Sequence, residues 1–216
     1  MGAEQYVPTQ QTQGGRFYVD PELTLYVSEV GQKMARVSDR PDLPYEFVVL
    51  NSSVPNAWAL PGGKIAINRG LLTELDDEAQ LASVLGHEIV HAAARHSVQR
   101  MQQGMLISAG VAGLGFALSD NEWAGLIMGG AALGAQLALA QYSQGDELES
   151  DHYGIIYMKE AGYDPQAAVE LQELFLKLSE GRQSSFIDGL FATHPPSARR
   201  VQENRELVQK VGAGGY

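Results

Sequence analysis

His87-Glu88-Ile89-Val90-His91 places two imidazoles one helical turn apart, so that His87 and His91 can bind the same metal ion. Glu88 is rotated by about 100° from His87 around the helix, close enough to contact a water on that ion. Zinc accepts imidazole nitrogen readily, and a zinc site with an open position lowers the pKa of bound water to about 7. The H-E-x-x-H spacing therefore predicts a catalytic zinc site.

The residues around this stretch indicate a buried helix. Asp76-Asp77-Glu78 precedes it, with acidic side chains where a helix N-terminus favours them. Apolar residues then recur at helical spacing: Leu81, Val84, Leu85, Ile89 and Val90. The alternative is an ordinary amphipathic helix with two surface histidines. A buried helix needs a reason for carrying two histidines, and metal binding supplies one.

A third protein ligand is expected downstream, because catalytic zinc usually has three. The candidates are Asp146, Glu147, Glu149, Asp151, His152 and His194. Glu147 and Asp151 are four residues apart and would project from one face of a second helix. Glu147 could bind zinc, while Asp151 could accept the N–H of a zinc-bound histidine and fix its tautomer. The alternative is a solvated acidic helix start.

H-E-x-x-H followed by E-x-x-x-D resembles the signature of the gluzincin metallopeptidases. More closely, the chain resembles the family that holds the CAAX prenyl endopeptidases, the HtpX proteases and their soluble bacterial relatives, peptidase family M48. Further matching stretches are Asn56-Ala57-Trp58-Ala59-Leu60-Pro61-Gly62-Gly63, residues 87–96 closed by Arg95-His96, residues 142–154, and Thr193-His194-Pro195-Pro196-Ser197 with Arg200. Together they extend over roughly residues 21–208 and are specific in combination.

The resemblance implies a role for each matching side chain. His87, His91 and Glu147 would be the ligands of one Zn²⁺ ion. Glu88 would be the general base that acts on the activated water. Asp151 would be the hydrogen-bond partner of a ligand histidine.

The resemblance also implies roles for two C-terminal residues. His194 would lie near the metal, either stabilising the tetrahedral intermediate or filling the fourth coordination position in a resting form. Arg200 would support the site. From the residues alone, His194 fits equally well as the start of a helix, since His-Pro-Pro-Ser is typical of a chain turning into one.

A short strand before the zinc motif is predicted to bind substrate. Its residues are Asn56, Ala57, Trp58, Ala59 and Leu60, and it stops at Pro61-Gly62-Gly63. A strand edge can hold an extended peptide by adding it as a further strand. The alternative is an ordinary edge strand with Trp58 in the core.

Composition limits the class of protein. The chain has 216 residues, 44% of them hydrophobic, which is enough for one substantial core. It has no cysteine, which excludes disulfides and a thiolate zinc site. The net charge of −11 argues against a nucleic-acid partner, because no basic stripe is present to neutralise phosphates.

The expected fold is α+β, a mostly helical zincin-like domain with a small sheet, an active-site helix and a glutamate helix. Besides the active-site helix, helices are predicted at residues 21–36, 146–161, 165–179 and 196–208, and strands at 45–50, 56–60 and 64–68. Residues 1–20 are predicted to be a flexible N-terminal lead-in, 21–210 a single metallopeptidase domain, and 211–216 a frayed C-terminus.

Two uncharged segments, residues 101–119 and 123–145, are long enough to raise the question of a membrane. Glycine and alanine dominate them and glutamines dilute their apolarity, so we expect residues 101–142 to form a close-packed helical hairpin beside the active site. A membrane hairpin is the alternative, and membrane proximity through this segment stays open. The chain starts without a secretion signal, but the resemblance implies the bacterial periplasm or cell envelope, with a signal peptide already removed.

Two functions are compatible with these features. The first is a zinc-dependent endopeptidase that hydrolyses unfolded or misassembled cell-envelope proteins, including outer-membrane proteins. The second is a zinc-binding chaperone or assembly factor whose peptidase site is latent and locked by His194. A purely structural zinc protein would leave Glu88 without a role.

Overall fold

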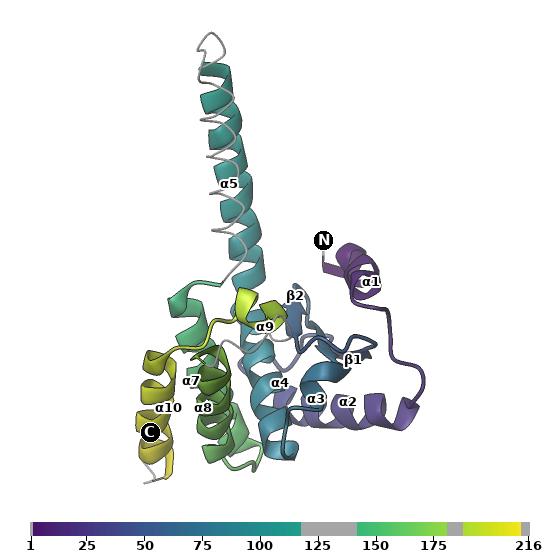
Figure 1. The fold of residues 1–216 in the computed structure, drawn as a ribbon, viewed down its shortest axis with the longest axis vertical. Coiled ribbons are helices and arrows are strands. Elements are labelled where there is room, and N and C mark those ends of the chain that lie inside the picture. Colours follow the sequence, from purple (N-terminus) through teal and green to yellow (C-terminus); the bar gives the residue numbers. More distant parts are fainter. Residues whose placement is uncertain (1, 118–141, 181–187, 213–216) are drawn as a thin grey trace.

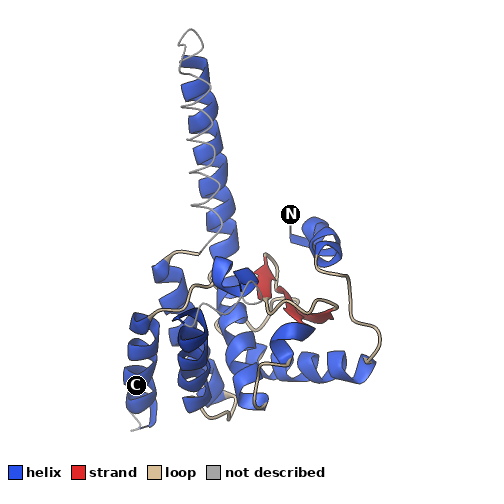
Figure 2. Cartoon of the chain, viewed as in Figure 1, coloured by secondary structure: helices blue, strands red, loops and turns tan. Residues whose placement is uncertain are grey.

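A three-stranded sheet separates the N-terminal helix from the helix that carries the H-E-x-x-H motif (Figure 1). The computed structural model describes residues 2–117, 142–180 and 188–212. These residues form helices α1 (Gly2–Thr12), α2 (Pro21–Ala35), α3 (Arg69–Leu72), α4 (Glu78–Ala93), α5 (His96–Ala117), α7 (Gln144–Glu160), α8 (Gln166–Glu180), α9 (Asp188–Thr193) and α10 (Ala198–Gly212), with strands β1 (Glu46–Leu50), β2 (Ala57–Leu60) and β3 (Lys64–Asn68). The predicted α+β fold, mostly helical with a small sheet, is confirmed (Figure 2).

The strand order is β1-β3-β2, with β1 parallel and β2 antiparallel to the central β3. Side chains alternate between the two faces, as the pleat of a strand requires. Phe47, Val49 and Ile65 face the main core with α2 and α4, whereas Val48 and Leu50 face the second, smaller cluster beneath α1. The sheet is thus buried on both sides.

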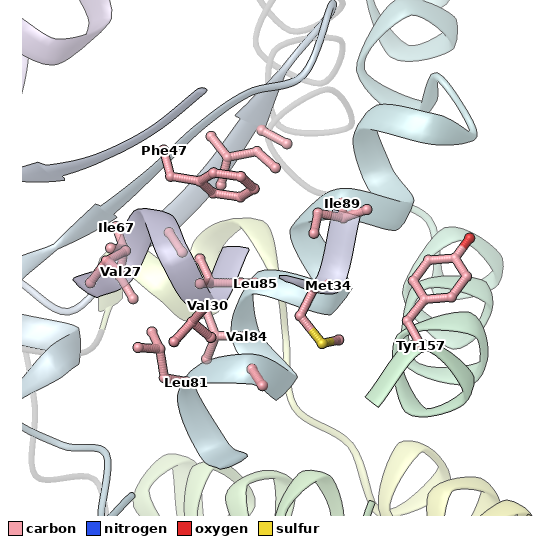
Figure 3. Packing of buried hydrophobic residues seen from close by; sticks show 14 of the residues in the cluster. Val27, Val30, Met34, Phe47, Ile67, Leu81, Val84, Leu85, Ile89 and Tyr157 are labelled. Carbon is pink, nitrogen blue, oxygen red and sulfur yellow. The ribbon is translucent and has the colours of Figure 1, made fainter. Parts of the chain in front are cut away.

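The main core lies between α2, α4 and the inner face of the sheet (Figure 3). Val30 and Met34 of α2 pack with Leu85 and Ile89 of α4, all 3% exposed or less. Asp77 caps α4 by accepting a hydrogen bond from the backbone N–H of Gln80 (2.8 Å). The apolar spacing and the acidic start therefore produce the buried helix that they predict.

The N-terminal segment differs from the expectation of a flexible lead-in. Residues Gly2–Thr12 form α1, and Tyr6 is only 5% exposed. The rings of Tyr6 and Trp58 meet edge to face at 6.1 Å. The outer face of the sheet is apolar and needs a cover, a tertiary requirement that the local run of glutamine, glycine and Pro8 does not reveal.

Helices α4 and α7 touch at a pair of glycines, Gly86 and Gly154, directly beside the H-E-x-x-H motif. A Cβ at Gly154 would lie 3.2 Å from the backbone nitrogen of His87 and 3.4 Å from the carbonyl carbon of Gly86. The two backbones can approach this closely because neither glycine has a side chain. This close approach brings the acidic residues of α7 within reach of the histidines of α4.

Replacing Gly154 with Ala should lower the free energy of unfolding by about 1–2 kcal/mol, since the overpacking cost exceeds the gain of about 1 kcal/mol in helix propensity. The variant should also bind metal more weakly, because the added methyl group presses on the backbone of His87. Chemical denaturation and a metal competition assay measure both effects. Gly145→Ala, in the same helix with 3.6 Å of clearance to Ser143 Oγ, is the matched control. Equal behaviour of the two variants would contradict the packing argument.

Helix α5 leaves the body of the molecule and projects away from it (Figure 1). Only its first turn lies beside the H-E-x-x-H motif (Figure 1), and Met105 and Leu106 are 57% and 74% exposed. The other half of the predicted hairpin, residues 118–141, lies outside the described residues. Within the described ranges, no helix combines the length and apolarity needed to cross a membrane.

Candidate metal centre

Four side chains from three parts of the chain converge on one point. His87 Nε2 lies 3.0 Å from His91 Nε2 and 3.3 Å from His194 Nδ1. Glu147 Oε1, from α7, lies 3.3 Å from His91 Nε2 and 2.9 Å from His194 Nδ1. The four atoms all lie within 4.8 Å of one another. Among the residues that the structure describes, these four form the group suited to holding a metal ion.

These separations fit a metal ion at the centre of the group. Ligand atoms about 2.0–2.1 Å from a tetrahedral zinc ion lie about 3.3–3.4 Å apart. His87 Nδ1 is 2.9 Å from Asp151 Oδ1, a contact that places a hydrogen on Nδ1, so that the neutral form of the ring has its lone pair on Nε2. That lone pair faces the nitrogens of His91 and His194, and a cation at the centre relieves the repulsion.

Burial and nearby charges shift the pKa values of His87 and His91 in opposite directions. For His87, the charge of Glu147 and the hydrogen bond to Asp151 outweigh burial and raise the pKa to about 10. For His91, burial prevails and holds the pKa well below its usual value, so that this ring is a neutral ligand. The surroundings of His87 therefore attract a positive charge, which a metal ion can supply.

Glu88 is 2% exposed and lies beside the converging atoms. Its Oε1 is 3.5 Å from His194 Nε2, and its Oε2 is buried without a hydrogen-bond partner. Burial raises the pKa of Glu88, partly offset by the charges of His194 and His87. Buried polar atoms rarely stay unpaired, so the free oxygen indicates a ligand such as water at this place.

The sequence matches a known family of metallopeptidases. The sequence model of Peptidase family M48 matches residues 21–208. The chain belongs to this family. The resemblance stated from the motifs is thereby confirmed.

Several relatives share the M48 region with this chain. It is 30% identical over 198 residues to the beta-barrel assembly-enhancing protease of Yersinia pestis, covering 89% of this chain and 40% of that protein. It is 34% identical over 190 residues to a mitochondrial metalloendopeptidase of Schizosaccharomyces pombe, covering 87% and 54%. It is 31% identical over 175 residues to the metalloprotease LoiP of Escherichia coli, covering 78% and 65%. The chain thus spans 40–65% of the length of these relatives.

Arg200 contacts two buried acidic residues of α7, Asp151 and Glu147. Its Nε and Nη2 donate to the two oxygens of Asp151 at 2.6 and 2.7 Å, and its Nη1 lies 2.7 Å from Glu147 Oε2, off the direction of a hydrogen bond. All three side chains are at most 6% exposed. Burial opposes the charge on Arg200, but Asp151 and Glu147 raise its pKa. With Glu88 ionised and His87 neutral, as a metal ligand must be, the three carboxylates exceed this one guanidinium by two charges, which a divalent ion would balance.

Sequence reasoning assigned no role to two residues that contact His91. The ring of Tyr142 stacks on His91, with centroids 3.9 Å apart, and His96 Nδ1 lies 3.0 Å from His91 Nδ1. Both residues lie within the stretches that resemble family M48. Helical spacing could not place them beside His91, because Tyr142 lies outside α4 and His96 follows the break between α4 and α5.

The predicted substrate strand lies at the edge of the sheet, as β2. Asn56 precedes the strand, and its carbonyl accepts a hydrogen bond from Asn68 N–H (2.9 Å). The alternation of an antiparallel ladder then turns the peptide groups of Ala57 and Ala59 toward the open edge. Ala57 also lines a pocket that contains His87.

Part of that open edge is already occupied. The hydroxyl of Ser97, in the first turn of α5, donates to the Ala59 carbonyl at 2.9 Å and lies 2.9 Å from the Tyr142 hydroxyl. The side chain of Trp58 lies on the face of the sheet beneath α1, against Tyr6. The remaining hydrogen-bonding groups of the edge belong to Ala57, which lines the same pocket as His87 but is only 1% exposed, so an added strand would have to displace what covers it.

Proposed function

We propose that the chain is a zinc-dependent endopeptidase that hydrolyses peptide bonds with Glu88 as general base, within a single metallopeptidase domain at residues 21–210. The observation that carries this proposal is the buried group of three nitrogens and one oxygen with an unpaired carboxylate oxygen of Glu88 beside it. A purely structural site has no need of that carboxylate.

His87, His91 and Glu147 would hold the ion. Two imidazole ligands with one carboxylate are a set that zinc uses in hydrolases, and no cysteine is present to favour a structural thiolate site. When bound, zinc supplies a Lewis acid that polarises the scissile carbonyl and lowers the pKa of water. The chain's own residues orient the ligands and move the protons.

Glu88 would take the proton of the attacking water and deliver it to the leaving amine. Its burial favours this exchange, since a raised pKa makes the carboxylate a better proton acceptor. Asp151 would hold the ring of His87 through Nδ1, and Arg200 would keep Asp151 ionised and fixed.

The substrate would be a polypeptide bound in an extended form. The edge at Ala57, once uncovered, could add it to the sheet as a fourth strand, which leaves Asn56, Trp58 and Leu60 in supporting roles. Relatives named for beta-barrel assembly support a substrate among unfolded or outer-membrane proteins and a location in the bacterial cell envelope.

The test is the zinc content and casein hydrolysis of the purified protein, before and after removal of metal by a chelator. We expect one zinc ion per chain and hydrolysis that is lost with the metal and restored by adding zinc. Protein that binds no zinc would contradict the metal centre. Protein that binds zinc but cleaves neither casein nor an unfolded outer-membrane protein would contradict the peptidase.

The position of His194 favours a second candidate, a zinc-binding chaperone or assembly factor with a latent peptidase site. Its Nδ1 lies among the ligand atoms, 3.3 Å from His87 Nε2 and 2.9 Å from Glu147 Oε1. His194 would then occupy the position that water needs in the active form.

Replacing His194 with Ala should therefore weaken zinc binding and raise casein hydrolysis several-fold, because the position becomes open to water. Equilibrium competition with a chromogenic chelator and initial rates of hydrolysis measure the two effects. The exposed His152, changed to Ala, is the control. A fall in hydrolysis with zinc still bound would instead show that His194 assists the reaction, and the lock would be rejected.

A further inference from the structure

His96 contacts the ring nitrogen of His91 that does not face the ligand cluster. Its Nδ1 lies 3.0 Å from His91 Nδ1, and its side chain is 3% exposed. His91 is fully buried, at 0% exposure, so its Nδ1 has no access to bulk water. His96 is the hydrogen-bond partner that the structure gives to this nitrogen.

The contact assigns the hydrogens of both rings. His91 can bind a metal through Nε2 only if that atom carries a lone pair, so its hydrogen is on Nδ1. His96 Nδ1 must then accept, which places the hydrogen of His96 on Nε2. That atom faces two carboxylate oxygens, Asp146 Oδ1 and Glu149 Oε2, each at 3.7 Å. Each ring thus has one arrangement of hydrogens that suits its neighbours.

The backbone is shaped to make this contact. In a continuous helix, a residue five positions after His91 would be rotated by about 140° and would face away from it. Helix α4 ends at Ala93, and Arg95 adopts a φ of +61°, the one left-handed φ of a non-glycine among the described residues. Such a φ is unfavourable for a residue with a Cβ. The Arg95 carbonyl then accepts from Val98 and Gln99 to start α5, whose first residue is His96.

We propose that His96 is a positioning residue, which fixes the tautomer and orientation of His91 for metal binding. The inference rests on the proposed metal centre and names the partner of its second histidine. His87 has a carboxylate, Asp151, in the equivalent place on its Nδ1. At His91 a neutral imidazole takes this role, with the carboxylates of Asp146 and Glu149 one ring further away, so that the buried centre gains no additional negative charge.

Two substitutions separate the hydrogen bond from the packing. His96→Asn places an oxygen acceptor where the imidazole has Nδ1, and so keeps the bond to His91. His96→Leu keeps comparable volume without an acceptor. His152→Leu, at an exposed position of α7, is the control for loss of a histidine. For each protein, zinc affinity is measured by chelator competition, and the metal-free form is unfolded by denaturant.

The expected result is a 10- to 100-fold weaker zinc affinity for His96→Leu, the usual effect of removing a partner of a ligand histidine. His96→Asn should bind within a few-fold of wild type, although both variants lose the contact with the carboxylates. A purely structural role would instead lower the stability of the metal-free protein and leave affinity unchanged. Equal losses of affinity in both His96 variants, or none in His96→Leu, would overturn the proposal.

Nitrogen-15 NMR of the imidazole rings tests the assignment directly in the wild type, even if a variant fails to fold. The proposal requires a hydrogen on Nδ1 of His91 and on Nε2 of His96 in the zinc-loaded protein. The reverse assignment would overturn it. Failure of the wild type to bind zinc would refute the proposed function. The spectrum of the metal-free protein would then decide on the His91–His96 bond alone.

Discussion

Replacing Glu88 with Gln should lower kcat for casein hydrolysis by about 10²- to 10⁴-fold while one zinc ion per chain remains bound. Glutamine has nearly the same shape as glutamate but cannot accept the proton of the attacking water. Glu88 is outside the group of ligand atoms, so its loss leaves His87, His91 and Glu147 in place. Metal analysis and steady-state kinetics on the same preparations check both halves of the prediction.

Glu170, an exposed glutamate of α8, provides the matched control. Glu170→Gln removes the same charge far from the chemistry and should leave kcat and zinc content unchanged. Loss of zinc from Glu88→Gln would mean that Glu88 is a ligand rather than a base. Retention of wild-type kcat would refute the proposed role of Glu88.

Replacing Arg200 with Met should lower the free energy of unfolding of the metal-free protein by about 3–5 kcal/mol. The substitution keeps an apolar stem of similar length but removes the cation that faces Asp151 and Glu147. Those two carboxylates are 6% and 1% exposed and would be left buried with only histidine partners, without the arginine charge. Chemical denaturation in the presence of a chelator measures this loss without a contribution from bound metal.

Arg205 lies on the same helix and pairs with Glu173 at 2.7 Å, but the two side chains are 58% and 42% exposed. Arg205→Met should therefore cost no more than about 1 kcal/mol. The contrast between the two variants isolates burial, since both lose an arginine–carboxylate pair from α10. Equal destabilisation would show that the pairs at Arg200 contribute no more than a surface ion pair.

Local spacing made part of this site predictable. His87 and His91 share a face because of the helical repeat, and Glu147 and Asp151 follow the same rule on α7. The placement of His194 in the cluster follows only from the family resemblance and the tertiary structure, because a loop delivers it. The strand at residues 64–68 and the helix from Pro21 agree closely with expectation, since their patterns are strong.

The rest depended on tertiary contacts that a sequence pattern does not encode. Helix α1 covers an apolar face of the sheet, and that face forms only when the strands are assembled. His96 reaches His91 because Arg95 takes a left-handed φ, and no glycine or asparagine is present there to signal such a turn. Predicting where the hairpin at residues 101–142 lies would have required the direction in which α5 leaves the body, which no sequence pattern gives. The spacing of residues identifies which side chains share one face of a helix, but not where the chain turns between helices.

The first turn of α5 couples any movement of that projecting helix to the metal centre. The 22 residues of α5 extend over about 33 Å, and its first turn holds both His96, against a ligand histidine, and Ser97, against the carbonyl of Ala59. A displacement of about 6 Å at the far end would rotate the first turn by about 10°. Catalytic arrangements tolerate only about 10–20° of misorientation, so a rotation of this size reaches that limit. Mechanical load on the projecting end of α5 would thus reach the proposed metal ligand and the proposed substrate edge together.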